Sequence, residues 1–191
     1  MIQLVRPACP NPAALSSGNY KHPQNKLALV KANSHKCMYC ESLVSHVYYG
    51  DVEHIVPKSV KPELEFVWEN LGYVCARCNG AKKDKYDEGL EIIDPYSEDP
   101  ALNLLAVGWV LYPLKGSAKG ELTILNVDLN RRELVQRRQD LINRVNRAVV
   151  ACFNSSSKQL QANALQALKA EAEADKEYAL FVDSFLKSQG I

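Results

Sequence analysis

The sequence has almost no net charge and no long hydrophobic run, and each absence excludes a class of protein. Its 191 residues carry 23 Lys and Arg against 22 Asp and Glu, a formal net charge of +1. Overall charge alone therefore cannot hold a nucleic acid, and any basic surface must come from local clustering. No apolar run reaches the roughly 20 residues that a membrane-spanning helix needs. The N-terminus lacks a basic stretch followed by an apolar one, so we expect a cytoplasmic protein without a secretory signal.

The composition is otherwise that of an ordinary globular protein, and the chain is long enough for a small catalytic unit with an extension. Prolines crowd the first 25 residues, where they favour an extended arm. We expect four segments: an N-terminal arm at 1–25, a motif-dense core at 26–95, a connecting segment at 96–127 and a C-terminal helical region at 128–191. The predicted class is α+β.

The apolar pattern predicts short elements in the core and long helices after it. A short helix is expected around 27–30, before the first cysteine pair. Strands are predicted at 44–49, 52–56 and 71–74, with a helix over 76–85. In the connecting segment, a hairpin would pair 107–112 with 122–125. Asp128 is a fair N-cap for a first C-terminal helix, which 154–157 would break before a second, antiparallel helix begins near Lys158.

Four of the six cysteines form two CxxC pairs, Cys37 with Cys40 and Cys75 with Cys78. Reduced thiols are expected in the cytoplasm, so metal ligation is favoured over disulfides. Four thiolates complete a closed tetrahedral Zn²⁺ shell, which makes the site structural. The alternative is a redox CxxC motif, but that needs a βαβ context that the surrounding sequence does not supply.

Between and after these pairs lie residues suited to phosphodiester chemistry. Glu53 is a ligand for a hard cation, and it adjoins His54, which can accept a proton near neutral pH. Asn79 is a neutral oxygen ligand whose position is set by the second cysteine pair. Glu53 and Asn79 together would leave water and phosphate to complete the shell of Mg²⁺ or Mn²⁺. Three lysines beside it suit the flanking phosphates of a substrate: Lys82, Lys83 and Lys85.

Strand geometry complicates this grouping. Successive residues of a regular strand point to opposite faces, so Glu53 and His54 converge on one ion only at a bulge or a strand end. Pro57 makes such an end plausible. Asp51, which shares a face with Glu53 by alternation, is the alternative ligand.

At these positions the sequence resembles the HNH endonuclease family, whose members combine an acid–His pair, a middle Asn and a final His or Asn, often between zinc knuckles. The resemblance implies a zinc-stapled ββα-metal core. It also implies that His54 is the general base, that Glu53 and Asn79 are metal ligands, and that Asn70 fixes the loop and orients the base. Glu and Asn replace the commoner Asp and His at the two ligand positions.

A longer resemblance points to the HNH nucleases of bacterial anti-phage systems called PtuB, found in Septu and in some retron systems. It rests on segments along most of the chain: VEHIVPKS, WENLGYVCARCN, IIDPYSEDP and NVDLNRRELVQRR. This resemblance implies an effector nuclease that works with a PtuA-type ABC ATPase on nucleic acid, with DNA as the expected target.

Two readings without catalysis stay open at this point. The chain could be a zinc-stabilised nucleic-acid-binding module, or a docking module whose zinc only scaffolds helices for a partner. An arginine-rich stretch would serve either phosphate binding or partner docking, and its members are Arg131, Arg132, Arg137, Arg138, Arg144 and Arg147. The Glu53–His54 pair and Asn79 favour the nuclease, because neither alternative needs them.

Overall fold

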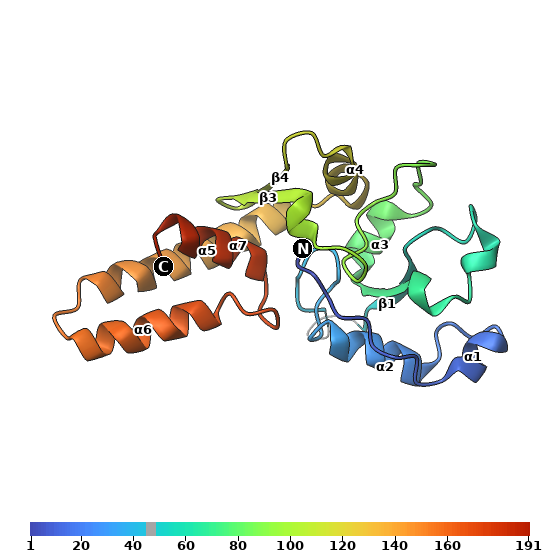
Figure 1. The fold of residues 1–191 in the computed structure, drawn as a ribbon, viewed down its shortest axis with the longest axis horizontal. Coiled ribbons are helices and arrows are strands. Elements are labelled where there is room, and N and C mark those ends of the chain that lie inside the picture. Colours follow the sequence, from blue (N-terminus) through green and yellow to red (C-terminus); the bar gives the residue numbers. More distant parts are fainter. Residues whose placement is uncertain (45–48) are drawn as a thin grey trace.

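The computed structural model describes residues 1–44 and 49–191 and combines helices with two small sheets (Figure 1). His46 and most of the strand predicted at 44–49 lie outside the described residues. The α+β class is confirmed. The elements in chain order are α1 (Pro12–Ser16), α2 (Pro23–Ala32), β1 (Asp51–His54), β2 (Leu71–Val74), α3 (Ala76–Lys82), β3 (Leu104–Val107), β4 (Val110–Pro113), α4 (Ala118–Val127), α5 (Arg132–Phe153), α6 (Lys158–Ala170) and α7 (Ala179–Ser188).

The β1, β2 and α3 elements form the predicted ββα unit. The strands pair antiparallel, with Glu53 opposite Gly72 and His54 opposite Leu71. Helix α3 packs against β1, and α2 packs against β2. All four residues of β2 are buried. A Cβ atom at Gly72 would lie 2.1 Å from the Met38 sulfur, so a larger residue there would force the buried Met38 side chain to move.

Helix α3 begins directly after Cys75, the first cysteine of the second CxxC pair, and ends earlier than predicted. The Cys75 side chain caps it by accepting a hydrogen bond from the Cys78 amide at 3.4 Å. Lys83 then takes a positive φ of 49°, which stops the helix after Lys82 rather than at residue 85.

The N-terminal arm is pinned onto the core along its length. Arg6 donates hydrogen bonds to the carbonyl oxygens of Trp68 and Leu71, at 3.0 and 2.7 Å. The Trp68 indole in turn donates to the Pro7 carbonyl at 2.8 Å. The arm therefore braces the turn that leads into β2. It is also less extended than predicted, because α1 lies within it and α2 starts at Pro23.

The hairpin predicted in the connecting segment is wrong in its pairing. The strands that pair are β3 and β4, with Leu105 opposite Tyr112 across the turn at Gly108. Residues 122–125 lie instead in α4, whose first turn is capped by the Ser117 hydroxyl. A short apolar run fits either a strand or a helix, so periodicity alone could not separate the two.

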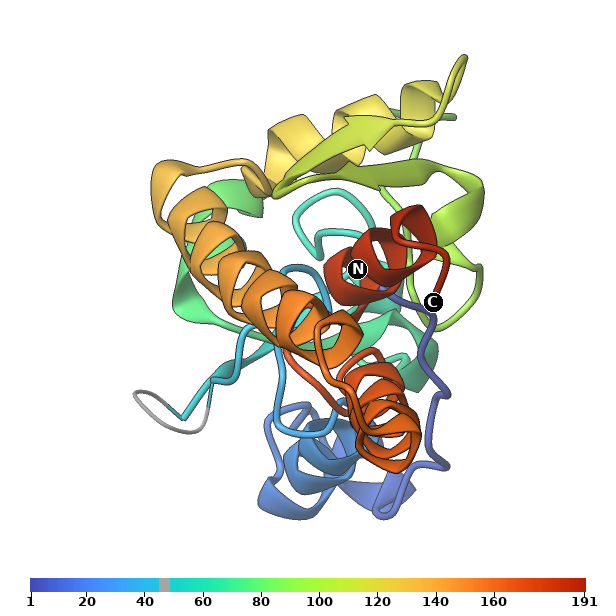
Figure 2. The same ribbon diagram turned by 90° about the vertical axis from the view of Figure 1, so that its left-hand side faces the viewer.

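The C-terminal region contains three helices where two were predicted. The break at 154–157 is confirmed, and α5 and α6 form a hairpin that extends away from the core, on the side opposite α1 (Figures 1 and 2). Asp128 does not cap α5, because it ends α4 in a left-handed conformation. Helix α7 follows α6 and packs on β3 and α5. Within the described ranges, no helix has the length and apolar character to cross a membrane.

Candidate metal centre and active site

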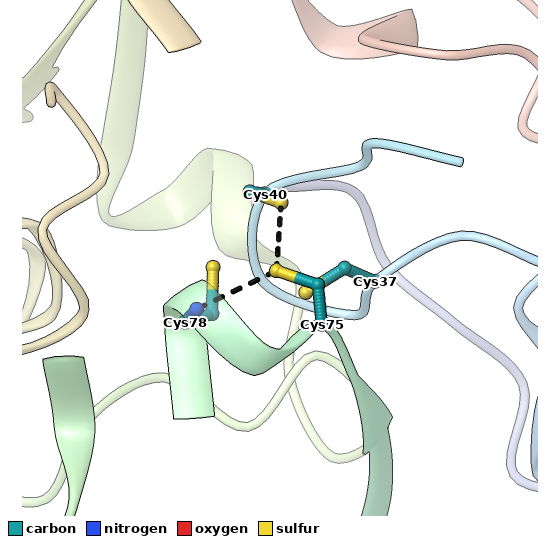
Figure 3. Close-up of side chains that lie close together, drawn as sticks. All are labelled: Cys37, Cys40, Cys75 and Cys78. Atoms are coloured by element: carbon teal, nitrogen blue, oxygen red, sulfur yellow. Dashed lines mark hydrogen bonds between the residues drawn. The ribbon is translucent and has the colours of Figure 1, made fainter. Parts of the chain in front are cut away.

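The two CxxC pairs meet between the loop that carries Cys37 and Cys40 and the start of α3 (Figure 3). Their four sulfur atoms all lie within 4.8 Å of one another. The Cys40 and Cys75 sulfurs are 3.9 Å apart. Three of the four side chains are buried, and Cys75 is half-buried. Four thiols at this spacing fit a tetrahedral Zn²⁺ ion with no open position, as expected of a structural site.

Positive charge from the C-terminal region faces this cluster. Arg131, immediately before α5, donates to the Cys78 sulfur at 3.5 Å. Burial alone would lower the pKa of Arg131, but the thiolates of Cys78 and Cys40 raise it overall. Hydrogen bonding from Cys37 lowers the pKa of Cys40, which favours a thiolate there. A four-thiolate zinc site carries two negative charges, so Arg131 offsets part of that charge and ties α5 to the metal centre.

The arginine-rich stretch thus does not form one surface. Arg138 is fully buried, donates to the Leu129 carbonyl at 2.8 Å and lies 4.2 Å from the centre of the Phe181 ring. The exposed members are Arg132, Arg137, Arg144 and Arg147.

His54 ends β1 with one side of its ring fixed. Its Nε2 atom lies 2.9 Å from the Glu65 carbonyl oxygen. A carbonyl only accepts hydrogen bonds, so Nε2 carries the proton and the free lone pair is on Nδ1. Burial lowers the pKa of His54, which keeps the ring neutral near neutral pH. A buried, neutral and oriented imidazole is suited to act as a general base.

Asn70 holds together the loop that carries Glu65. Its side-chain oxygen accepts from the Val56 amide at 2.8 Å, and its amide donates to the Val56 and Leu64 carbonyls at 2.9 and 3.2 Å. These bonds join the end of β1 to the residue before Glu65. Asn70 thereby supports the carbonyl that orients His54, in keeping with the loop-fixing role that the family resemblance implies.

Lys82 lies inside the molecule, not on the surface where a phosphate contact was expected. Its ammonium donates to the Glu53 carboxylate at 2.6 Å and to the His54 carbonyl at 2.8 Å. Its exposed fraction is 0%. Burial raises the pKa of Glu53, and Lys82 opposes that shift. Lys83 and Lys85 are exposed, so both remain available to a substrate.

The expected pairing of Glu53 with Asn79 is replaced by two separate contacts. The Asn79 amide donates to the Asp51 carboxylate at 3.1 Å, while Glu53 binds Lys82. Asp51 and Glu53 both face α3, as strand alternation predicts, whereas the side chain of His54 contacts Glu65 and Tyr20 instead. The structure thus gathers three oxygen-bearing side chains at the β1–α3 junction.

Two residues at the site gave no signal in the sequence. Tyr20, at the end of the N-terminal arm, packs its ring against His54 with centroids 4.6 Å apart. Glu65 acts through its backbone carbonyl, which any residue type could supply. Neither contact can be read from local spacing, because each depends on where the arm and the loop fold back.

Removing the ammonium of Lys82 should destabilise the fold through Glu53. Lys82→Met leaves a buried carboxylate unpaired, and we expect a loss of about 3–5 kcal/mol in unfolding free energy. Adding Glu53→Gln removes both charges, so the double variant should lose less than the sum of the single losses. Urea unfolding of the four proteins measures this coupling.

Lys85→Met is the matched control for Lys82→Met, since Lys85 is exposed on the same segment. It should change stability by no more than about 0.5 kcal/mol. Additive effects of Lys82→Met and Glu53→Gln would contradict a buried ion pair at this position.

Comparison with known proteins agrees with this geometry. Residues 37–85 match the family model of the HNH endonuclease. A Septu protein PtuB of Bacillus thuringiensis is 37% identical over 145 residues, and the match covers 68% of this chain and 55% of that protein. A Septu protein PtuB of Bacillus mycoides is 31% identical over 150 residues, covering 62% and 51%.

The chain therefore spans about half the length of the curated relatives it matches. The family-model match begins at the first zinc-knuckle cysteine and ends at Lys85, so it encloses the cysteine cluster together with β1, β2 and α3. Residues 37–85 thus form an HNH endonuclease domain, carried by a chain that is homologous to the Septu PtuB proteins.

Proposed function

We propose that this protein is a metal-dependent endonuclease that hydrolyses phosphodiester bonds of DNA as the effector of an anti-phage defence system. The observation that carries the proposal is the buried His54 ring, which the Glu65 carbonyl holds in place within a matched HNH domain. A zinc-stabilised binding module has no need for an oriented, buried imidazole.

His54 takes the role of general base. With Nε2 protonated, Nδ1 accepts a proton from the water that attacks the phosphorus atom. The imidazolium that results is stabilised because Nε2 keeps its hydrogen bond to the Glu65 carbonyl. Asn70 keeps that carbonyl in place, so it acts as a positioning residue.

The β1–α3 junction supplies the oxygen ligands for the catalytic cation. Mg²⁺ or Mn²⁺ held there would supply positive charge to offset the charge that develops on the phosphate and its leaving oxygen. Carboxylate and amide oxygens are the donors that such hard cations prefer, so the residues present fit the ion. We propose Glu53 and Asn79 as ligands, with Asp51 as a further carboxylate because it already contacts Asn79. To hold the ion, the Glu53 carboxylate would have to release Lys82.

The exposed lysines beside α3 suit the substrate backbone. Lys83 and Lys85 follow the buried Lys82 and face solvent, where ammonium groups can contact the phosphates next to the scissile one. As the family resemblance implies, the products carry a 5′-phosphate and a 3′-hydroxyl.

The homology to Septu PtuB proteins supports a role in an anti-phage defence system, and we propose that the protein acts there in the cytoplasm. We propose a PtuA-type ABC ATPase as the partner that regulates cleavage. The exposed arginines of α5 then serve either this partner or the substrate.

The test is cleavage of supercoiled plasmid by the purified chain with Mg²⁺ or Mn²⁺, alone and together with the ABC ATPase. We expect nicked and linear products that depend on the added cation. A parallel reaction with single-stranded RNA separates the two nucleic acids. An absence of cleavage in every combination would leave the binding or docking module as the better interpretation.

A further inference from the structure

An aromatic and basic cluster borders the His54 side chain. Its centre is Tyr20, whose ring meets the His54 imidazole edge to face and lies 6.4 Å from the Phe66 ring. Two ammonium groups lie over the Tyr20 ring, Lys58 at 5.2 Å and Lys21 at 5.5 Å from its centre. The cluster joins the N-terminal arm to the loop that follows β1.

The cluster faces solvent although it touches a buried base. Tyr20 is half-buried, Lys21 is exposed and Phe66 is 40% exposed. Lys58 also pairs with the Glu65 carboxylate at 2.6 Å, and 46% of its side chain is exposed. The two lysines and Glu65 together give the cluster one net positive charge.

The ion pair with Glu65 does not prevent Lys58 from binding a phosphate. Surface ion pairs contribute little, with a median near 0–1 kcal/mol, because solvent screens them. A phosphate diester presents its charge on two outer oxygens and can draw both lysines at once. Aromatic rings beside a basic groove are how proteins bind nucleic-acid strands without reading their sequence.

We propose that Tyr20, Lys21, Lys58 and Phe66 form a subsite for the nucleotide next to the scissile bond, with the lysines on its phosphate and the rings against its sugar and unpaired base. This inference rests on the proposed nuclease function and extends its substrate contacts to the N-terminal arm. It also links substrate binding to catalysis, because the ring that borders the nucleotide is the one that packs on His54.

The lysines are tested by the salt dependence of binding. The double variant Lys21→Gln/Lys58→Gln is compared with wild type for binding a fluorescent single-stranded DNA oligonucleotide, without added Mg²⁺ or Mn²⁺, over a series of salt concentrations. Two lost phosphate contacts should reduce the slope of log affinity against log salt by about 1.4, since each contributes about 0.7 on a single strand. The Kd at low salt should rise about tenfold.

A matched control changes the same charge elsewhere. Lys158→Gln/Lys169→Gln alters two exposed lysines of α6, at the end of the molecule opposite α1 (Figure 1). It should leave the slope unchanged. Glu65→Gln should act in the opposite direction, with tighter binding and a steeper slope, because it frees Lys58 while keeping the carbonyl that orients His54.

The rings are tested by Tyr20→Leu and Phe66→Leu, which should weaken binding of the single strand while Tyr20→Phe preserves it. An unchanged slope in Lys21→Gln/Lys58→Gln, with wild type binding normally, would overturn the subsite and leave the nuclease proposal intact. A wild-type chain that cleaves plasmid but does not bind the oligonucleotide would also overturn the subsite, whereas failure in both assays would overturn the nuclease proposal as well.

Discussion

His54→Ala is expected to lower the rate of plasmid cleavage by about 10² to 10⁴-fold, the range that a general base contributes. The variant lacks the Nδ1 atom that accepts the proton of the attacking water. Its unfolding free energy should fall by only about 1–3 kcal/mol, the cost of leaving the Glu65 carbonyl without its donor. Zinc content should stay at one ion per chain, because the cysteine cluster does not involve this residue.

The control for this variant is His35→Asn. His35 is exposed and has a positive φ of 63°, a conformation that Asn also tolerates. It should leave cleavage, zinc content and stability unchanged. Added imidazole should restore part of the activity of His54→Ala, since the missing group acts by taking a proton. Full activity of His54→Ala would assign the base to another residue and remove the main support for the proposed mechanism.

Spacing along the chain was enough to predict the metal centre and the ββα unit. Two CxxC pairs have few ways to satisfy four thiolates, and the apolar pattern indicated the strand at 71–74 and the helix after it, which flank the second pair. The position of Lys82 could have been predicted by the same reasoning. Lys82 lies four residues after Cys78, which must face the metal, so one turn later it lies on the same buried side of α3.

Contacts made by the N-terminal arm could not be predicted in this way. Arg6 reaches Leu71 and Tyr20 reaches His54 across long stretches of chain, and no local pattern encodes such contacts. The hairpin predicted in the connecting segment was wrong for a different reason. Both apolar runs were predicted as strands. The second run, residues 122–125, lies instead in α4, a helix that the Ser117 side chain caps.

Cys75→Ser should have the largest effect on stability of any single change considered. Serine retains a side-chain oxygen that can cap α3 in place of the sulfur, so the change isolates the loss of a metal ligand. Zinc binding contributes about 10–16 kcal/mol to the folding of small zinc domains. A whole domain is stable by only about 5–15 kcal/mol, so losing even half of the zinc contribution should unfold the core.

Elemental analysis and thermal unfolding followed by circular dichroism measure this prediction. Cys75→Ser should hold far less than one zinc per chain and lose its cooperative transition, and a strong chelator should do the same to wild type. Cys9→Ser is the control, because Cys9 is half-buried and its sulfur contacts only the Asn25 side chain among the bonds described for it. The effect should extend into α5, since Arg131 would lose the thiolate charge that holds it near Cys78. A Cys75→Ser protein with full zinc and an unchanged transition would show that three thiolates are enough to hold the fold.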